Sequence, residues 1–276
     1  MNRIFRVYEA AFEGVNGVLE RKIPPYFSSG TELFYHKRQS SEVYAVNFLE
    51  TSLCDDEREE EIVACVERAV KRSLQKYKIC KKDLVLVIGV GNEGLTADAL
   101  GAKTLEHLVV TEHLHEGKER LRGRGRLAGF GAGVSGVTGI SSFKVIKALI
   151  KATSPSLIIA IDTLCCKDVN RLNRTIQIST AGLTPGAGVG NAQISLNNKT
   201  LGIPVLAIGV PLVIYMQDVI GKFLAKNNHI ASTENSKNFS LSEFNGVLVT
   251  SKEIDIIVNK TARIIAKGIN LAVHGH

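Results

Sequence analysis

Two aspartates, Asp98 and Asp162, are the residues of this chain whose positions could support acid–base chemistry. Each follows a short, continuous apolar run, at residues 84–88 and 157–161, of the kind that forms a strand buried on both faces. The carboxyl ends of parallel strands share one crevice, where ligands and catalysis gather. Two carboxylates in that crevice would share a proton, so that one serves as a base and the other as an acid.

Each aspartate also has a purely structural interpretation, and spacing alone leaves both interpretations open. Asp98 in the first turn of a helix would stabilise the helix dipole by about 0.3–1 kcal/mol, and Asp162 after a strand could cap the next helix. The motif Gly89-x-Gly91-Asn92-x-Gly94 before Asp98 fits a dinucleotide-binding fingerprint. We reject that fingerprint because Asp98 would repel the pyrophosphate at the start of the helix.

Two further segments are rich in glycine. Residues 184–191 carry Gly186, Gly188 and Gly190 at every second position, and residues 129–140 form a second small-residue segment that we expect to be a loop. Such loops leave backbone N–H groups uncovered, so they either bind anions or let a peptide backbone approach closely. A flexible turn is the alternative.

The histidines and cysteines give weaker signals. His113 and His115 are spaced i, i+2 with no distant third ligand, so a surface or packing role is favoured over a metal site. The five cysteines form no CxxC pair, which fits a reducing compartment. No apolar run reaches the roughly 18–20 residues of a membrane span, and no signal peptide is evident, so we expect a cytoplasmic protein.

The order of the elements predicts an α/β fold. Continuous apolar strands are expected at residues 84–88, 157–161 and 204–208, with a shorter one at 108–111. Helices are expected at residues 97–108, 142–152 and 212–224 between and after these strands. Alternation of this kind favours a doubly wound, mostly parallel sheet flanked by helices.

The flanking regions complete one expected domain over residues 1–276. Residues 1–50 form an N-terminal β-rich addition with a hairpin, and residues 55–78 form an amphipathic helix. The core that carries the site spans residues 80–215. A long helix over residues 250–276 begins with a capping box, Thr250-Ser251-Lys252-Glu253.

These segments together resemble the germination protease family of endospore-forming bacteria. The resemblance rests on motifs in the family's order and spacing from about residue 84 to 211: Gly89-Val90-Gly91-Asn92, Thr96-Ala97-Asp98-Ala99-Leu100-Gly101, Gly133-Val134-x-Gly136-x-Thr138-Gly139-Ile140, Ile159-Ala160-Ile161-Asp162-x-Leu164, Arg171-x-Asn173-x-Thr175-Ile176-Gln177-Ile178-Ser179, Gly182-x-x-Pro185-Gly186-x-Gly188-Val189-Gly190-Asn191 and Thr200-Leu201-Gly202-Ile203-Pro204-Val205-x-Ala207-Ile208-Gly209-Val210-Pro211.

The resemblance implies an endopeptidase that degrades small acid-soluble spore proteins during germination, in the cytoplasm of the forespore or spore core. It implies an inactive precursor that matures by self-cleavage within the N-terminal region, and a homotetramer. It places the family's two essential aspartates at Asp98 and Asp162. It also implies a fold similar to that of the hydrogenase maturation endopeptidases, which use acidic residues to hold a metal. No membrane and no direct nucleic-acid partner is expected.

Three hypotheses follow. In the first, Asp98 and Asp162 act as a pair without a cofactor, while backbone groups bind the substrate or the oxyanion; the candidates are Gly91, Asn92, Gly186, Gly188, Gly190 and Asn191. In the second, Asp98 and Asp162 hold a divalent metal ion with help from His113 or His115. In the third, the chain is a catalytically lapsed binding protein, because Ser141-Ser142 and Cys165-Cys166-Lys167 depart from the family pattern.

Overall fold

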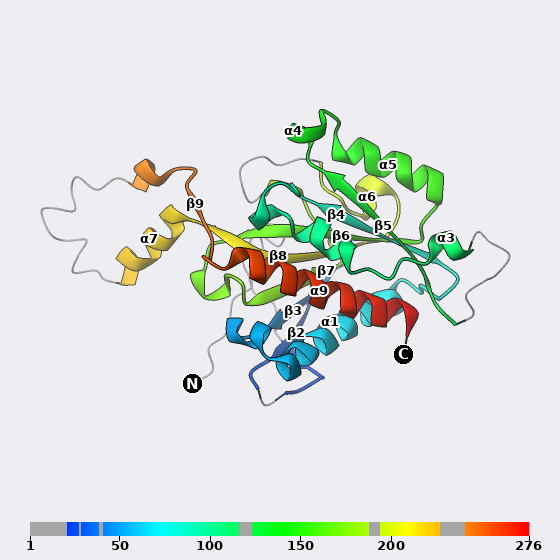
Figure 1. Cartoon of the computed structure of the whole chain (residues 1–276), viewed down its shortest axis with the longest axis horizontal. Helices are drawn as coiled ribbons and strands as arrows, with labels where there is room; N and C mark the ends of the chain where they lie inside the picture. Colours follow the sequence, from blue (N-terminus) through cyan, green and yellow to red (C-terminus); the bar gives the residue numbers. More distant parts are fainter. Residues whose placement is uncertain are drawn as a thin grey trace, which may run out of the picture.

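The computed structural model describes residues 21–27, 29–38, 41–115, 123–187, 194–226 and 241–275. In these ranges one nine-stranded sheet has helices on both of its faces (Figure 1). Its strands are β1 (Arg21–Ile23), β2 (Glu32–Arg38), β3 (Ser41–Asn47), β4 (Leu84–Val90), β5 (Arg126–Gly133), β6 (Leu157–Cys166), β7 (Thr175–Ser179), β8 (Val205–Tyr215) and β9 (Leu248–Val249). The α/β class is therefore confirmed.

The helices connect and cover these strands. The α-helices are α1 (Asp56–Lys76), α2 (Leu100–Glu106), α3 (Glu112–His115), α4 (Ser135–Thr138), α5 (Ser142–Thr153), α6 (Asn198–Leu201), α7 (Met216–Lys226) and α9 (Ile254–His274). Short 3₁₀ turns are η1 (Glu50–Cys54), η2 (Thr96–Asp98), η3 (Val169–Arg171) and η6 (Leu241–Phe244). None of the helices described here is long and apolar enough to span a membrane.

The sheet has a parallel half that positions the site. Its strand order is β1-β2-β3-β7-β8-β6-β4-β5, and strands β5, β4, β6 and β8 are parallel to one another. Along the chain, β4 is followed by β5 on one side and by β6 on the other. The strand order therefore reverses between β4 and β6, which is where open α/β sheets bind their ligands.

The other half of the sheet is antiparallel, so the prediction of a mostly parallel sheet is wrong. Strand β7 pairs antiparallel with β8, and the predicted hairpin, now β2 and β3, adds to β7 through β3. The chain passes from β6 to β7 through only η3 and a turn, which is too short for a parallel crossover. The strand at 175–179 was not predicted, because five alternating residues give a weak signal.

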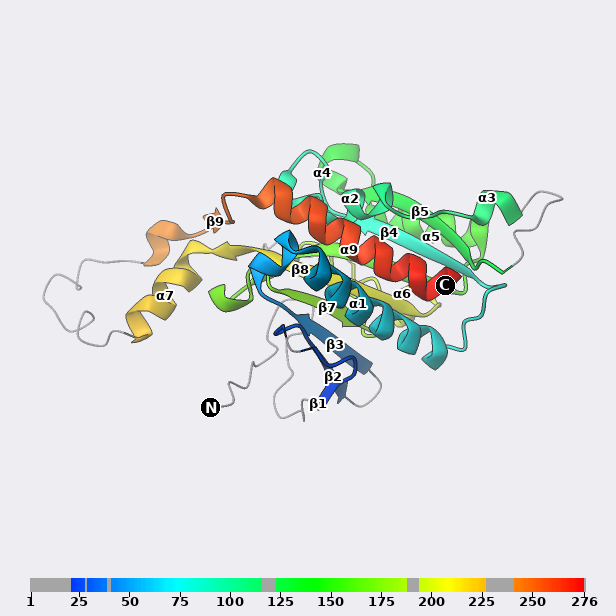
Figure 2. The same ribbon diagram turned by 60° about the horizontal axis from the view of Figure 1, so that its bottom comes forward.

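The two faces of the parallel half are covered by different helices (Figure 2). Alternate side chains such as Val87 and Ile159 pack with α1, α2 and α9, whereas Ile88 and Ile158 pack with α5 and α6. Helices α1 and α9 lie side by side on the first face, where a Cβ on Gly268 would come within 2.6 Å of Val66. The doubly covered sheet explains why its strands read as continuous apolar runs.

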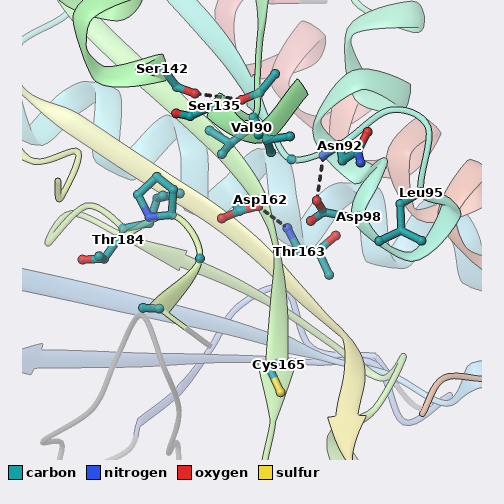
Figure 3. A pocket seen from close by; sticks show the side chains of 18 of the residues that line it. Val90, Asn92, Leu95, Asp98, Ser135, Ser142, Asp162, Thr163, Cys165 and Thr184 are labelled. Carbon is teal, nitrogen blue, oxygen red and sulfur yellow. Dashed lines mark hydrogen bonds between the residues drawn. The ribbon is translucent and has the colours of Figure 1, made fainter. Parts of the chain in front are cut away.

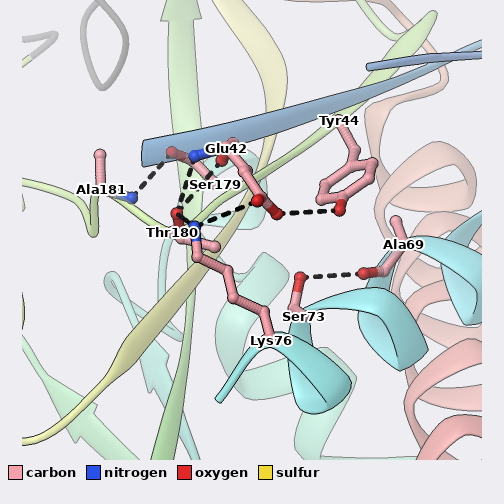
Figure 4. A network of polar contacts seen from close by, with 8 residues as sticks. All are labelled: Glu42, Tyr44, Ala69, Ser73, Lys76, Ser179, Thr180 and Ala181. Atoms are coloured by element: carbon pink, nitrogen blue, oxygen red, sulfur yellow. Dashed lines mark hydrogen bonds and ion pairs between the residues drawn. The ribbon is translucent and has the colours of Figure 1, made fainter. Parts of the chain in front are cut away.

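A polar network fastens the antiparallel half to the helical layer (Figure 4). The Glu42 N–H donates to Thr180 Oγ1 at 2.8 Å, and the Thr180 N–H donates to the Glu42 carbonyl at 2.9 Å. The Glu42 carboxylate accepts from the Tyr44 hydroxyl at 3.2 Å and lies 3.4 Å from Lys76 Nζ. Glu42 therefore links β3, the end of β7 and the end of α1.

Three predicted elements differ in the structure. Residues 108–111 form no strand. The edge strand is β5, which overlaps the first part of the expected loop at 129–140, because its ladder with β4 overrides the low strand propensity of glycine. The helix expected from residue 212 begins at Met216, because β8 continues to Tyr215. The prediction of a capping box is wrong. Thr250 Oγ1 donates to the Leu212 carbonyl at 2.6 Å, and the side chain of Glu253, the N-cap residue of α9, makes no capping hydrogen bond.

The remaining helices are close to their predicted bounds. Helix α1 begins after Asp55, whose carboxylate accepts from the N–H groups of Glu57 and Arg58. Helix α5 occupies residues 142–153, one residue longer than expected. The helix predicted at 97–108 is divided, because η2 precedes a shorter α2. This division determines where Asp98 lies.

Candidate active site

Asp98 is held over the carboxyl end of β4 by a tight turn. Gly91 has φ +103°, and a Cβ there would lie 2.2 Å from the Asp98 carbonyl oxygen, so only glycine fits. The chain then returns through η2, and the Asn92 N–H donates to Asp98 Oδ2 at 2.7 Å. Asp98 thus precedes α2 and does not lie in its first turn, where it would have stabilised the helix dipole. The turn holds it above the end of the strand instead.

A contact between two glycines sets the height of α2 above β4. A Cβ on Gly89 would come within 2.7 Å of the Gly101 carbonyl carbon, and a Cβ on Gly101 within 2.4 Å of the Val90 carbonyl oxygen. Helix and strand therefore touch backbone to backbone. This contact brings η2, and with it Asp98, close to the sheet.

Asp162 lies inside β6 and does not cap a helix. Strand β6 continues to Cys166, so Asp162 is in the ladder opposite Gly209 of β8. Its side chain is only 7 % exposed, and Asp162 Oδ1 accepts from the Thr163 N–H at 2.9 Å. The alternative of a capping aspartate is therefore wrong, and a carboxyl group is buried in the parallel half of the sheet.

The two aspartates line one cavity of about 800 Å³ (Figure 3). Burial raises the pKa of Asp162 to about 8, and the charge of Asp98 adds to this rise. Burial also raises the pKa of Asp98, which the hydrogen bond from the Asn92 N–H opposes. Because the charge of Asp98 acts on Asp162, Asp98 ionises first and Asp162 keeps its proton at neutral pH.

The predicted backbone groups are placed only in part. Gly91, Asn92 and Gly186 line the cavity. The Asn92 N–H is already used by Asp98, and its side-chain Oδ1 accepts from the Gly94 N–H at 3.0 Å. The predicted residues Gly188, Gly190 and Asn191 lie outside the described residues. A contact of any of these groups with a substrate stays a prediction.

Known proteins carry the same sequence pattern. A sequence model of the family described as germination protease matches residues 37–227, which include both aspartates. The chain belongs to the germination protease family. It is 38% identical to the germination protease of Clostridium tetani over 228 residues, covering 74% of this chain and 70% of the relative. It is 33% identical to that of Clostridium acetobutylicum, covering 86% and 80%, and 31% identical to that of Bacillus subtilis, covering 80% and 74%.

Membership of the germination protease family makes the chain an endopeptidase, as the resemblance implied. The family match spans the whole cavity wall except Leu248. That wall includes polar residues which the sequence analysis did not place at the site: Ser135, Thr163 and Thr184. Isolated hydroxyl side chains give no spacing signal, so only the fold brings them together.

The buried hydroxyl group of Thr163 is notable among them. Thr163 follows Asp162, and in Figure 3 its side chain points toward Asp98. Its Oγ1 is buried and has no hydrogen-bond partner in the described part of the chain. Buried hydroxyl groups are nearly always hydrogen-bonded.

The histidines are not brought to the aspartates. His113 lies in α3, whose Glu112 pairs with Arg126 at the start of β5, whereas Gly133 at the other end of β5 lines the cavity. The eight residues of β5 span roughly 23 Å, so the α3 end of the strand lies far from the cavity. Among the residues described, no group of three or more His, Cys, Asp or Glu side chains could hold a metal ion. The described residues therefore place no third His, Cys, Asp or Glu ligand beside the two aspartates, and we derive no step through a metal.

Proposed function

We propose that this endopeptidase cleaves small acid-soluble spore proteins during germination, with Asp98 and Asp162 as its acid–base pair. The proposal is carried by one observation: two carboxyl groups line one cavity in different surroundings, with Asp162 buried inside β6 and Asp98 held on a turn by the Asn92 N–H. A base and an acid are needed at the same pH to hydrolyse a peptide bond, and unequal environments provide both from identical side chains.

The reaction we propose has two steps. Ionised Asp98 takes a proton from water, the water oxygen bonds to the carbonyl carbon, and protonated Asp162 donates its proton to the carbonyl oxygen. The tetrahedral intermediate then collapses: the C–N bond breaks, the amine nitrogen gains the proton that Asp98 took, and the hydroxyl proton returns to Asp162. Both carboxyl groups end in their initial states, so the reaction consumes only the peptide bond and one water molecule.

The cavity wall provides groups that would hold the peptide. Gly186 has φ +71° and begins the glycine segment whose N–H groups we propose bind the oxyanion or the substrate backbone. We further propose that the chain assembles as a tetramer, is activated by self-cleavage in its N-terminal region, and shares its fold with the hydrogenase maturation endopeptidases. The motif resemblance supports these three points.

The test uses two isosteric variants, Asp98→Asn and Asp162→Asn, and a purified small acid-soluble spore protein. Each variant should lose cleavage by at least 1,000-fold while keeping the far-UV circular dichroism of the parent. Full activity in either variant would refute the pair. Failure of the unmodified chain to cleave, even after limited removal of its N-terminal segment, would favour the lapsed binding protein.

A further inference from the structure

Strand β5 is the last strand on one side of the sheet, and in the part of the chain that the structure describes most of its outer edge has no backbone partner. The segment before α3 covers only the beginning of this edge. There the Thr111 N–H donates to the Leu127 carbonyl at 2.8 Å, and the Leu127 N–H donates to Thr111 Oγ1 at 3.0 Å. Leu127 therefore directs both of its backbone groups away from β4.

The alternation of a strand extends this direction to the residues that follow. The N–H and C=O groups of every second residue point to the same side, so Gly129 and Gly131 also direct theirs outward. Both glycines are exposed. Within the described part of the chain, these outward groups have no backbone partner. The edge from Gly129 to Gly131 thus presents unpaired main chain to an approaching peptide, whereas at the end of the strand the Gly133 carbonyl accepts from Ser142 Oγ at 2.9 Å.

Proteins usually protect such an edge with lysine, proline or a covering segment, because it invites pairing with another chain. The stretch Gly129-Phe130-Gly131 has no such protection in its sequence. Packing explains one glycine, since a Cβ on Gly129 would come within 3.1 Å of Leu105 Cδ2. It does not explain the other, because a Cβ on Gly131 would be 3.7 Å from its nearest neighbour, an ordinary contact. Position 131 therefore accepts an alanine side chain without a clash, which leaves the backbone groups of the edge unchanged.

The uncovered edge runs toward the cavity. Gly133 ends β5, and Gly133, Val134 and Ser135 form part of the wall of the cavity that holds Asp98 and Asp162. A peptide paired with Gly129 and Gly131 would therefore be led to the aspartates. We propose that the outer edge of β5 from Gly129 to Gly131 binds an extended segment of the substrate as an additional strand. This inference rests on the proposed function.

A substrate segment suits this edge better than a second copy of the chain. Three strand residues span about 10 Å, whereas a stable protein interface buries roughly 1,200 Å² or more. Phe130, at 36 % exposure, is the only large apolar side chain of the strand that reaches the surface. Main-chain pairing requires only an extended peptide, and added strands of this kind gain affinity from backbone hydrogen bonds.

The experiment compares Gly131→Pro with Gly131→Ala. Proline removes the outward N–H and places its ring on the edge, whereas alanine keeps the N–H and fits the space beside Leu105. We expect Gly131→Pro to raise KM for a full-length small acid-soluble spore protein about 10-fold with kcat retained, and Gly131→Ala to stay within about twofold. Neither variant should change KM for a peptide of about six residues around the cleaved bond.

Two further measurements keep the outcome decisive. The same variants in an Asp162→Asn background should show the same ratio in Kd for the full-length substrate, which tests the edge even if the chain does not cleave. A 15-residue peptide with N-methyl groups at alternate residues should bind the unmodified protein about 10-fold more weakly than its unmethylated form. This second measurement does not depend on how well Gly131→Pro folds.

Several results would overturn the inference. An unchanged KM and Kd for the full-length substrate in Gly131→Pro would do so. An equal rise in KM for the short peptide would also do so. A smaller particle mass for Gly131→Pro alone, measured by sedimentation, would assign the edge to a second copy of the chain. Absence of cleavage with the expected ratio in Kd would instead refute the proposed function and leave the edge as a binding site.

Discussion

Replacing Asp162 with asparagine should make the folded protein more stable at neutral pH while it abolishes cleavage. The pKa of Asp162 is about 8 in the folded protein, against about 3.9 in an unfolded chain. Between these values the folded state holds a proton that the unfolded state releases. The free energy of unfolding therefore falls as pH rises through this window, by up to 1.4 kcal/mol per pH unit.

The magnitude follows from the two pKa values. Relative to a side chain that is always neutral, Asp162 destabilises the fold by about 1–2 kcal/mol at pH 5, about 4 kcal/mol at pH 7 and about 5 kcal/mol above pH 8. Asparagine has nearly the same shape and no charge, so Asp162→Asn removes this dependence. Any difference in hydrogen bonding between the amide and the protonated acid adds a constant offset and leaves the slope intact.

The assay is urea-induced unfolding at pH 5, 6, 7, 8 and 9, with intact mass checked for self-cleavage. The stability of Asp162→Asn minus that of the unmodified chain should rise steadily from pH 5 to pH 8 and become constant by pH 9. Asp255→Asn is the matched control, because Asp255 is exposed at the start of α9 and should give a constant difference. A constant difference for Asp162→Asn as well would show that burial does not raise its pKa, and the assigned order of ionisation would be wrong.

Three shorter predictions concern the same site. The rate kcat/KM should fall above about pH 8, where Asp162 loses its proton, and a rate that stays level to pH 10 in a pH–rate profile would contradict its role as the acid. Thr163→Val removes an unpartnered buried hydroxyl, so urea unfolding should show a stability unchanged or about 1 kcal/mol higher; a loss of more than 1 kcal/mol would reveal a partner for it. Gly101→Ala should cost about 1–3 kcal/mol and reduce cleavage, because its Cβ would meet the Val90 carbonyl, whereas Gly221→Ala, with open space around it, should not destabilise the chain.

The parts of the fold that could be predicted are those in which local pattern and packing agree. Residues 84–88 and 157–161 read as buried strands because helices cover both of their faces, and the rule that parallel strands meet at their carboxyl ends brought Asp98 and Asp162 together. Strand β5 was missed because its glycines have low strand propensity and only the ladder with β4 orders them. The antiparallel β7 was missed because its partners, β3 and β8, lie far away in sequence.

The sequence predicted that two carboxyl groups act as a pair, but it did not predict which of them holds the proton. Spacing indicates that two carboxyl groups meet, but which one holds the proton depends on burial and on single hydrogen bonds. Asp98 lies on a turn where the Asn92 N–H reaches its carboxylate, whereas Asp162 lies opposite Gly209 in the ladder with β8 and is 7 % exposed. These differences arise from a helix start shifted by three residues and a strand longer by five, which are the boundaries that patterns define least well.

The same geometry explains why glycine surrounds the two aspartates. Asp162 can be buried next to a second acid only if the surrounding backbone holds both in place against a cost of roughly 4 kcal/mol at neutral pH. Gly91 and Gly101 let η2 and α2 touch β4 directly, so Asp98 cannot move away from the sheet without breaking this contact. On the other side, Gly209 stands opposite Asp162 in the ladder with β8. Close glycine contacts therefore keep the charge of Asp98 near Asp162. That charge helps Asp162 to keep its proton, so Asp98 has the role of base.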